Sequence, residues 1–273
     1  MLKRILTSLV SGCILVPVLI LSDTVILPIG ISLVTCLAVY EVMHCTGLHK
    51  NMWLSVPMYL CAFALPYIIR YVESERLTQY LMIGIFVLIL YGFFVMVLSH
   101  KTAPVPSVTT ALVTALYAVV GVCSIIYIHD IPAGGKYFYL LIFIGAWFTD
   151  TFAYFTGVLL GKHKLIPEIS PKKTVEGSIG GIVFCTLGFV AFALIYNNFL
   201  ATEGETVSYL FISIMGVVTS IVAQIGDLSM SALKRHYGIK DFGKIFPGHG
   251  GVLDRFDSVI AVAICLGIAF ALR

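Results

Sequence analysis

The sequence predicts an all-α fold, a polytopic integral membrane helical bundle of about nine transmembrane helices. Hydrophobic residues make up 59% of the 273 positions and charged residues only 11%, whereas a typical soluble domain carries about 25% charged residues. Apolar runs long enough to cross a hydrocarbon core, which takes about 20 helical residues, recur along the whole chain. Period-2 alternation with frequent turns is absent from the sequence, and unpaired backbone groups are costly in lipid, so a β-barrel is disfavoured.

The predicted spans begin at the first residues of the chain. The segment 5–22 follows a basic start and is similar to a signal peptide, but it lacks a small-residue cleavage site and another span follows at once, so we interpret it as a retained helix. The last apolar run, from Ser258 to Leu272, is too short to cross alone, and its helix is therefore expected to begin near Val252. After 5–22 the predicted spans are 25–47, 52–70, 78–99, 107–129, 137–160, 178–199, 207–230 and 252–272.

Basic residues are distributed unevenly between the two predicted faces of the membrane. With the N-terminus in the cytoplasm, the outer segments hold only Arg70, Arg76, Lys136 and Arg273 of the 17 Lys and Arg residues. This bias is the one that the positive-inside rule describes. We therefore expect a multi-pass protein of the cell (inner) membrane with a cytoplasmic N-terminus and an active site that faces the cytoplasm.

The residues that carry chemistry are concentrated in the second half of the chain. Residues 1–130 are expected to form an apolar transmembrane scaffold or packing region. The one acid within a span there, Glu41, is interpreted as a satisfied polar group near a helix end. Residues 131–273 are expected to form the catalytic transmembrane region, with cytoplasmic loops at 161–177 and 231–257.

Four aspartates lie in predicted spans of this second half, where an unpaired charge is costly and marks a candidate site. The predicted topology turns the cytoplasmic ends of the three spans that carry them toward the same side, so their carboxylates can converge. The chain lacks the Cys and His spacing of a zinc site, and carboxylates among cations favour Mg²⁺, which completes its shell with phosphate oxygens. The four residues are Asp150, Asp227, Asp254 and Asp257.

Asp227 belongs to a polar stripe that runs toward the cytoplasm. Gln224, Asp227, Ser231 and Lys234 follow one another at spacings of three and four, which places them on one face of a helix. A structural alternative stays open, in which Asp227 only pairs with a basic residue of its own helix. For Asp257 the alternative is a simple helix cap, because carboxylates are favoured near a helix N-terminus.

Two segments rich in glycine and basic residues are predicted to handle phosphate. Gly161–Gly181, "GKHKLIPEISPKKTVEGSIGG", supplies four lysines before a glycine-rich helix start, where backbone N–H groups and ammonium groups bind anions. In Gly243–Ser258, "GKIFPGHGGVLDRFDS", the glycines let the backbone approach a ligand closely. Taken alone, the first segment is also typical of a topology signal or a lipid-surface contact, and His249 of a loop hydrogen-bonder.

The segment from Ser231 to Asp257, "SALKRHYGIKDFGKIFPGHGGVLDRFD", resembles the signature of the phosphatidate cytidylyltransferase (CDP-diacylglycerol synthase) family. Two further blocks are similar to that family, "SPKKTVEG" at 170–177 and the region from Asp150 to "GKHK" at 161–164. Together they cover about residues 145–258, and the first half is similar only in being apolar and multi-spanning. The chain departs from the family pattern at Met230, where many relatives have a glutamate, and between Gly157 and Gly161, where it lacks a basic residue.

The resemblance implies a reaction of CTP with phosphatidate that gives CDP-diacylglycerol and diphosphate in phospholipid biosynthesis. It further implies a Mg²⁺ requirement, often an additional monovalent cation, and often a homodimer in the lipid bilayer, and no nucleic acid is expected. The nearest alternative is a CTP-dependent lipid kinase of the dolichol or phytol kinase type, which transfers the γ-phosphate to an alcohol. An ion-coupled transporter is disfavoured, because the charges open to one side only and paired repeats are not found.

The expected site combines the family blocks with the carboxylates. Asp227 and Asp254 are expected to be catalytic, together with Lys234 and Arg235. The expected metal ligands are Asp227, Asp254 and Asp257. The expected substrate-binding residues are Asp150, Lys172, Lys173, Thr174, Glu176, Ser231, Lys240, Asp241, His249, Gly250, Gly251 and Arg255.

Overall fold

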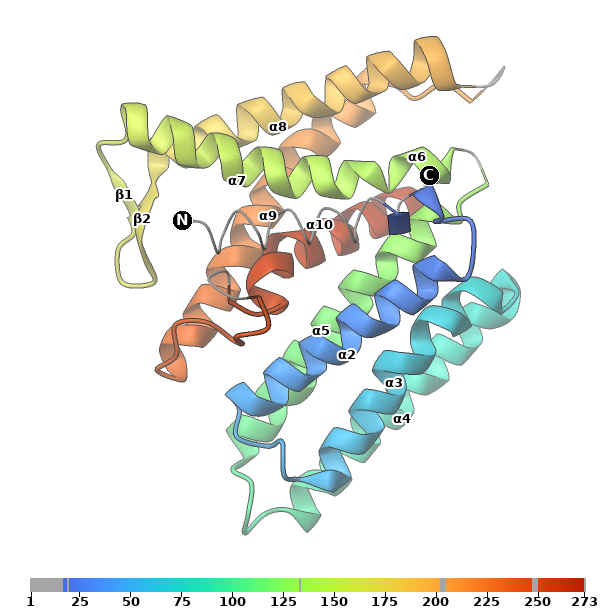
Figure 1. The fold of residues 1–273 in the computed structure, drawn as a ribbon, viewed down its shortest axis with the longest axis vertical. Helices are drawn as coiled ribbons and strands as arrows, with labels where there is room; N and C mark the ends of the chain where they lie inside the picture. Colours follow the sequence, from blue (N-terminus) through green and yellow to red (C-terminus); the bar gives the residue numbers. More distant parts are fainter. Residues whose placement is uncertain (1–16, 19, 133, 202–204, 247–249, 273) are drawn as a thin grey trace. The chain divides into compact units, whose positions relative to one another are not determined.

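The structure is a computed structural model that describes residues 17–272 except 19, 133, 202–204 and 247–249. Helices dominate it, and the labels of Figure 1 are used below. The elements in chain order are α2 (Ile26–Cys45), α3 (Met52–Tyr71), α4 (Ser74–Leu98), α5 (Val105–His129), α6 (Gly135–Phe138), α7 (Leu140–Leu160), β1 (Lys164–Ile166), β2 (Ser170–Thr174), α8 (Val175–Ile195), the π-helical turn η1 (Tyr196–Leu200), α9 (Tyr209–His236) and α10 (Leu253–Ala271).

The polytopic helical class is confirmed. Seven of the described helices are long and apolar enough to cross a membrane. Each predicted span from 25–47 onward coincides with a helix, and α10 begins at Leu253, one residue after the start that the short last run required. Most of the first predicted span, 5–22, lies outside the described residues, and α10 carries three charged residues near its start, so the total of nine spans stays a prediction.

The chain divides into two compact units. One comprises the residues up to Ile126 together with Ile239–Arg255, and the other comprises Tyr127–Gly238 together with Phe256–Arg273. The segment between α9 and α10 therefore belongs to the same unit as α2, α3, α4 and most of α5. The functional division into a scaffold and a catalytic region stays a prediction.

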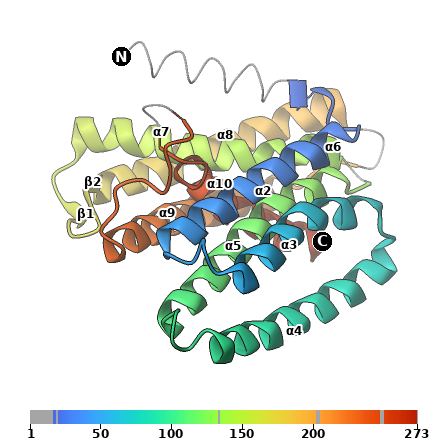
Figure 2. The ribbon, with the colours of Figure 1, turned by 60° about the horizontal axis from the view of Figure 1, so that its bottom comes forward.

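In the first unit, α2 and α3 form an antiparallel pair (Figure 2). Thr35 is fully buried in α2 and donates a hydrogen bond to the Ala62 carbonyl of α3 at 2.8 Å. Asn51 caps α3 by accepting a hydrogen bond from the N–H of Leu54. The Thr35 bond fixes the two apolar helices against each other where water cannot satisfy polar groups, and the Asn51 cap satisfies a backbone donor at the start of α3.

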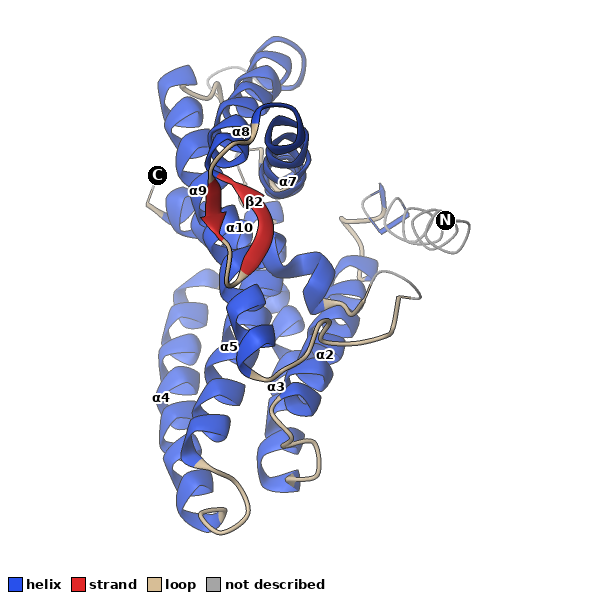
Figure 3. Cartoon of the chain, turned by 90° about the vertical axis from the view of Figure 1, so that its left-hand side faces the viewer, coloured by secondary structure: helices blue, strands red, loops and turns tan. Residues whose placement is uncertain are grey.

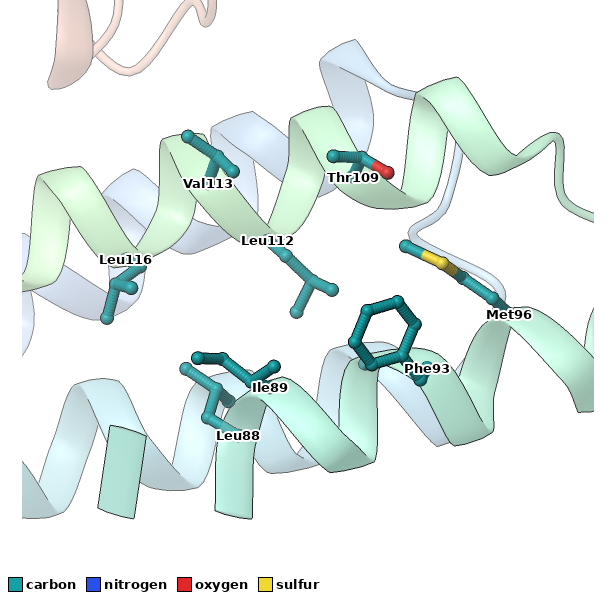
Figure 4. A pocket seen from close by; sticks show the side chains of 9 residues that line it. Leu88, Ile89, Phe93, Met96, Thr109, Leu112, Val113 and Leu116 are labelled. Carbon is teal, nitrogen blue, oxygen red and sulfur yellow. The ribbon is translucent and has the colours of Figure 1, made fainter. Parts of the chain in front are cut away.

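Helices α4 and α5 enclose an apolar groove of about 220 Å³ (Figure 4). Leu88 and Phe93 of α4 and Leu112 of α5 line it, and Thr109 is the polar residue among the lining side chains. Such a surface offers no charged group to a phosphate-bearing ligand, so the groove is not a candidate for the predicted chemistry.

In the second unit, α7 and α8 run side by side at close range (Figure 1). A Cβ added at Gly177 would lie 2.6 Å from the Ala153 carbonyl oxygen, and one added at Gly180 would lie 2.5 Å from the Thr156 Cβ. The small residues at four-residue intervals in α7 therefore serve helix packing, as the packing interpretation of that spacing predicts. Nearer the start of α7, a Cβ added at Gly145 would lie 2.7 Å from Cγ2 of Thr219 in α9.

The segment predicted as a loop, 161–177, contains a short β-hairpin. Residues Lys164–Ile166 and Ser170–Thr174 pair as an antiparallel hairpin, with Lys164 opposite Thr174 and Ile166 opposite Ser170 (Figure 3). The strands have three and five residues, too short and too polar to show an alternating pattern in the sequence. Helix α8 then starts at Val175, immediately after the second strand.

Helices take both ends of the segment 231–257, as the polar stripe up to Lys234 and the expected start of the last helix near Val252 predict. Helix α9 continues to His236, six residues beyond the predicted boundary at 230, and α10 takes over at Leu253. The extension contains Ala232, Leu233 and two basic residues, which are good helix formers although they end the apolar run. Asp227 therefore lies more than two turns before the end of α9, and Lys234 and Arg235 lie in its last turn.

Candidate active site

The second unit contains a cavity of about 680 Å³, within the usual range for small-molecule sites. Its walls come from the C-terminal half of α7, the hairpin, the first turn of α8 and the middle of α9. Lys162 and Lys164 add two further cations to the lining. Among the predicted site residues, those that line this cavity are Asp150, Lys172, Lys173, Thr174 and Asp227.

An ion pair crosses the cavity between the hairpin and α9. Strand β2 presents Lys173, whose ammonium group pairs with the carboxylate of Asp227, and the two side chains are 26% and 22% exposed. Asp227 also accepts a hydrogen bond from the Ser231 hydroxyl at 3.4 Å. The polar stripe on α9 is therefore confirmed, and an ion-pair partner of Asp227 comes from β2, which the structural alternative did not consider.

Thr174 joins the hairpin to α8. Its hydroxyl oxygen accepts a hydrogen bond from the N–H of Gly177 at 3.1 Å and thus caps the helix. The cap fixes the two residues before it, Lys172 and Lys173, next to the positive end of the helix dipole. An expected anion-binding combination of lysines and a helix start is therefore present in one wall of the cavity.

The carboxylate of Glu176 contacts His163, the residue directly before the hairpin. Its carboxylate accepts the backbone N–H of His163 with both oxygens at 3.2 Å, and Oε1 lies 2.7 Å from Nδ1 of the same residue. These contacts tie the start of the hairpin to the first turn of α8. Glu176 thus holds the start of the hairpin against α8. Its predicted contact with substrate stays a prediction.

Two more carboxylates lie near Asp227 in this unit. Asp257 is 9% exposed, accepts the N–H of Ser258 at 2.8 Å, and has Asp227, Asp150 and Lys234 as charged neighbours. The Ser258 hydroxyl donates to Asp150 at 3.0 Å and so links α10 to α7. The sequence analysis did not identify Ser258 as a site residue or predict the contact between His163 and Glu176. For Ser258, the available signal was its position directly after Asp257.

The donor chemistry of this unit suits Mg²⁺. Within the described part of the chain, groups of three or more His, Cys, Asp or Glu side chains arranged to hold a metal are not found. Mg²⁺ normally takes only one or two protein carboxylates and completes its shell with water and phosphate oxygens. Oxygen donors on Asp227, Asp257 and Asp150, with cations beside them, therefore fit that ion.

The segment between α9 and α10, in the first unit, is organised by Asp254. This buried carboxylate accepts the N–H of Phe242 at 2.8 Å and of Gly251 at 2.9 Å. Gly250 has φ of +87°, which favours glycine, and a Cβ there would also crowd the Asp254 carboxylate at 2.9 Å. Asp254 therefore shapes the loop, and its predicted metal ligation stays a prediction.

The remaining predicted residues divide between the units. Lys240, Asp241 and Arg255 are exposed on the first unit. On the second, Arg235 donates from Nε to the Ile169 carbonyl at 3.4 Å. His249 lies outside the described residues. The second unit contains Asp150, Lys172, Lys173, Thr174, Glu176, Asp227, Ser231, Lys234, Arg235 and Asp257, and the first contains Lys240, Asp241, Gly250, Gly251, Asp254 and Arg255.

Comparison with known proteins identifies the class to which this arrangement belongs. A profile described as "Cytidylyltransferase family" matches residues 2–272. The chain belongs to the cytidylyltransferase family. Relatives within this family include proteins named phosphatidate cytidylyltransferase from Staphylococcus saprophyticus, 33% identical over 271 residues, and Staphylococcus epidermidis, 35% identical over 268 residues. Each of these alignments covers 97% of this chain and 97% of the relative.

Proposed function

We propose that this cytidylyltransferase transfers the cytidylyl group of CTP to phosphatidate and so forms CDP-diacylglycerol and diphosphate. The observation that carries the proposal is the cavity in which lysines of the hairpin meet Asp227 of α9 at the positive end of α8. A site of this kind suits two polyanionic reactants. Family membership over nearly the whole chain and the names of its relatives support the same reaction.

In the proposed reaction, an oxygen of the phosphatidate phosphate attacks the α-phosphorus of CTP. The bond from that phosphorus to the oxygen bridging to the β-phosphorus breaks, and diphosphate leaves with the electron pair. A phosphate monoester is largely dianionic at neutral pH, since its second pKa is about 6, so the attack needs no protein base. The difficulty is mutual repulsion, and neutralisation and alignment are the main tasks of the protein.

The hairpin lysines are proposed to hold the triphosphate. Lys172 and Lys173 precede the capped start of α8, and Lys162 and Lys164 lie across the same hairpin. Arg235 and Lys234, in the last turn of α9, are proposed to hold phosphate groups at its cytoplasmic end. When CTP binds, Lys173 exchanges its contact with Asp227 for a phosphate oxygen and leaves that carboxylate available.

Asp227 is proposed to hold Mg²⁺ together with Asp254, and Asp257 to ligate the ion or orient its shell. The bound ion would neutralise phosphate charge and align the reactants. An additional monovalent cation is proposed beside it on the strength of the family resemblance. Asp150 and Ser258 orient the neighbouring carboxylates through their mutual hydrogen bond.

The proposed setting is the cell membrane, with the hairpin and the segment between α9 and α10 on the cytoplasmic side. Phosphatidate keeps its acyl chains in the bilayer, and its head group then meets CTP from the cytosol. The charge bias between the predicted faces supports this topology, and the family resemblance supports a homodimer. With nine spans and a cytoplasmic N-terminus, the C-terminus lies outside the cytoplasm. A reporter enzyme that works only outside the cytoplasm should therefore be active when it is fused there. An inactive reporter would mean that the orientation or the number of spans is wrong.

The decisive experiment incubates the purified protein with phosphatidate, Mg²⁺ and CTP labelled at either the α- or the γ-phosphate. Label from the α-position should enter the organic phase, with release of diphosphate. Label that enters lipid only from the γ-position would instead establish the lipid kinase. Replacement of phosphatidate by diacylglycerol is the matched control, because it removes the attacking phosphate and should abolish transfer.

A further inference from the structure

A buried carboxylate in the first half of the chain contacts the segment that carries Asp254. Glu41, near the C-terminal end of α2, accepts the N–H of Val252 and the N–H of Leu253, each at 2.8 Å. Its side chain is fully buried. The interpretation of Glu41 as a satisfied polar group is thus confirmed, and the groups that satisfy it lie 211 and 212 residues away in the sequence.

Two glycines of the same segment make room for this carboxylate. A Cβ added at Gly251 would lie 2.5 Å from the Glu41 Cδ, and one added at Gly243 would lie 2.9 Å from the same atom. Both distances are too short for real atoms. The approach of Glu41 therefore accounts for glycine at both positions, and the predicted contact of Gly251 with substrate stays a prediction.

The contacts of Glu41 and Asp254 are adjacent. The N–H groups of Gly251, Val252 and Leu253 are consecutive donors at the start of α10, and carboxylates of the chain accept all of them. Hydrogen bonds to charged groups in a buried setting are the stronger ones. Glu41 of α2 thus holds the two residues directly before Asp254, and Asp254 itself holds the N–H of Gly251. Together these contacts fix the position of Asp254 relative to α2.

We propose that Glu41 is a positioning residue for the cytidylyl transfer, acting through the backbone of Val252 and Leu253 to hold Asp254 in its working geometry. The inference rests on the proposed function, in which Asp254 is a metal ligand. It gives the first half of the chain a direct part in the site, beyond the scaffold role that the sequence predicts.

The main test is Glu41→Gln in the full-length protein, with Thr35→Val as a matched control. Glutamine keeps the shape and one acceptor oxygen but turns an NH₂ group toward the second N–H. Thr35 is equally buried in α2, and its hydroxyl also bonds to backbone across α2 and α3, so its loss tests general damage to that helix. Hydrogen exchange of a peptide covering Gly250–Asp254 and the kinetics of α-label transfer are both measured on the folded fraction.

For Glu41→Gln we expect faster exchange in that peptide and unchanged exchange in peptides of α7 and α8. We also expect kcat/KM for CTP to fall by roughly tenfold or more, as loss of one charged hydrogen bond implies, with kcat carrying most of the loss. Thr35→Val should leave both unchanged in the folded fraction. Unchanged exchange in Glu41→Gln would overturn the anchoring, and faster exchange with wild-type kinetics would overturn the positioning role.

Gly243→Ala covers the case in which Glu41→Gln does not fold. The new methyl group pushes on the same carboxylate without removing its charge, and the same pattern of exchange and kinetics is expected. Normal exchange and kinetics in this variant would contradict the proposal. If the wild-type protein transfers no α-label, the proposed function fails by itself, and the exchange data still decide whether Glu41 anchors the loop.

Discussion

Lys173 of the hairpin and Asp227 of α9 form an ion pair inside the cavity of the second unit. The two residues are 54 positions apart in the sequence, and the hairpin brings them together. Lys173 is suited to bind phosphate and Asp227 to bind a cation. In the absence of both ligands, the two side chains neutralise each other. Its two roles, structural and chemical, can be separated by substitution.

A charge swap, Lys173→Asp with Asp227→Lys, should restore the ion pair but not the activity. Each single substitution leaves a half-buried charge without this partner, and each should abolish or strongly reduce α-label transfer. The melting temperature of the double variant should be higher than that of either single variant. Turnover should stay absent, because the proposed roles need a positive charge at position 173 to bind phosphate and a negative charge at position 227 to bind the metal. Recovery of turnover in the swap would reduce the pair to a structural contact.

Lys172→Glu should raise the KM for CTP more than it lowers kcat. Lys172 lines the cavity and is exposed, so its replacement leaves packing intact and repels the triphosphate. A rise in KM of roughly tenfold corresponds to loss of one charge-assisted contact. Lys101→Ala is the control, since Lys101 is exposed in the turn between α4 and α5, and unchanged CTP kinetics in Lys172→Glu would count against the phosphate-binding role.

Thr174→Val should destabilise the protein by about 1 kcal/mol through loss of the helix cap. Valine keeps the shape that packs beside Gly157 and Gly161 but cannot accept the Gly177 N–H. Thr174→Ser retains the oxygen and should restore the melting temperature. If valine and serine melt alike, the hydrogen bond is not the source of stability at this position.

Gly177→Ala should destabilise the pairing of α7 and α8 by roughly 1–3 kcal/mol, the usual cost of overpacking. The new methyl group would meet the Ala153 carbonyl oxygen, which is backbone and cannot turn away. Gly84→Ala is the matched control, because the same addition in α4 meets nothing within 4 Å. The melting temperatures of the two variants give the comparison, and equal values would remove the close-packing explanation.

The helices could be predicted from the sequence because membrane spans follow from length and apolarity alone. The convergence of Lys173 and Asp227 could be predicted only in part. The predicted topology places both residues on one side of the membrane, but the hairpin that brings them together is short, polar and without an alternating pattern. Hydropathy alone would end α9 at Met230, whereas the polar stripe up to Lys234 predicts a longer helix, which in the structure continues to His236.

The contact of Glu41 with Val252 and Leu253 could not be predicted from local patterns. Every residue other than proline has a backbone N–H, so the sequence does not indicate which N–H groups bond to Glu41. The two partners are also more than 200 residues apart, so no helical or strand periodicity relates them. The available signal was indirect. Gly243 and Gly251 stand where a side chain would collide with Glu41, but glycine beside a predicted phosphate loop has a simpler explanation in sequence terms.

The distance along the chain between Glu41 and its donors has a consequence for biosynthesis. The ribosome delivers the acceptor with the early helices and the donors only with the last one. Throughout most of translation this carboxyl group must find water or another temporary partner at the insertion machinery. A nascent chain that stops before its final helix therefore lacks the two backbone donors that satisfy this acid in the folded protein.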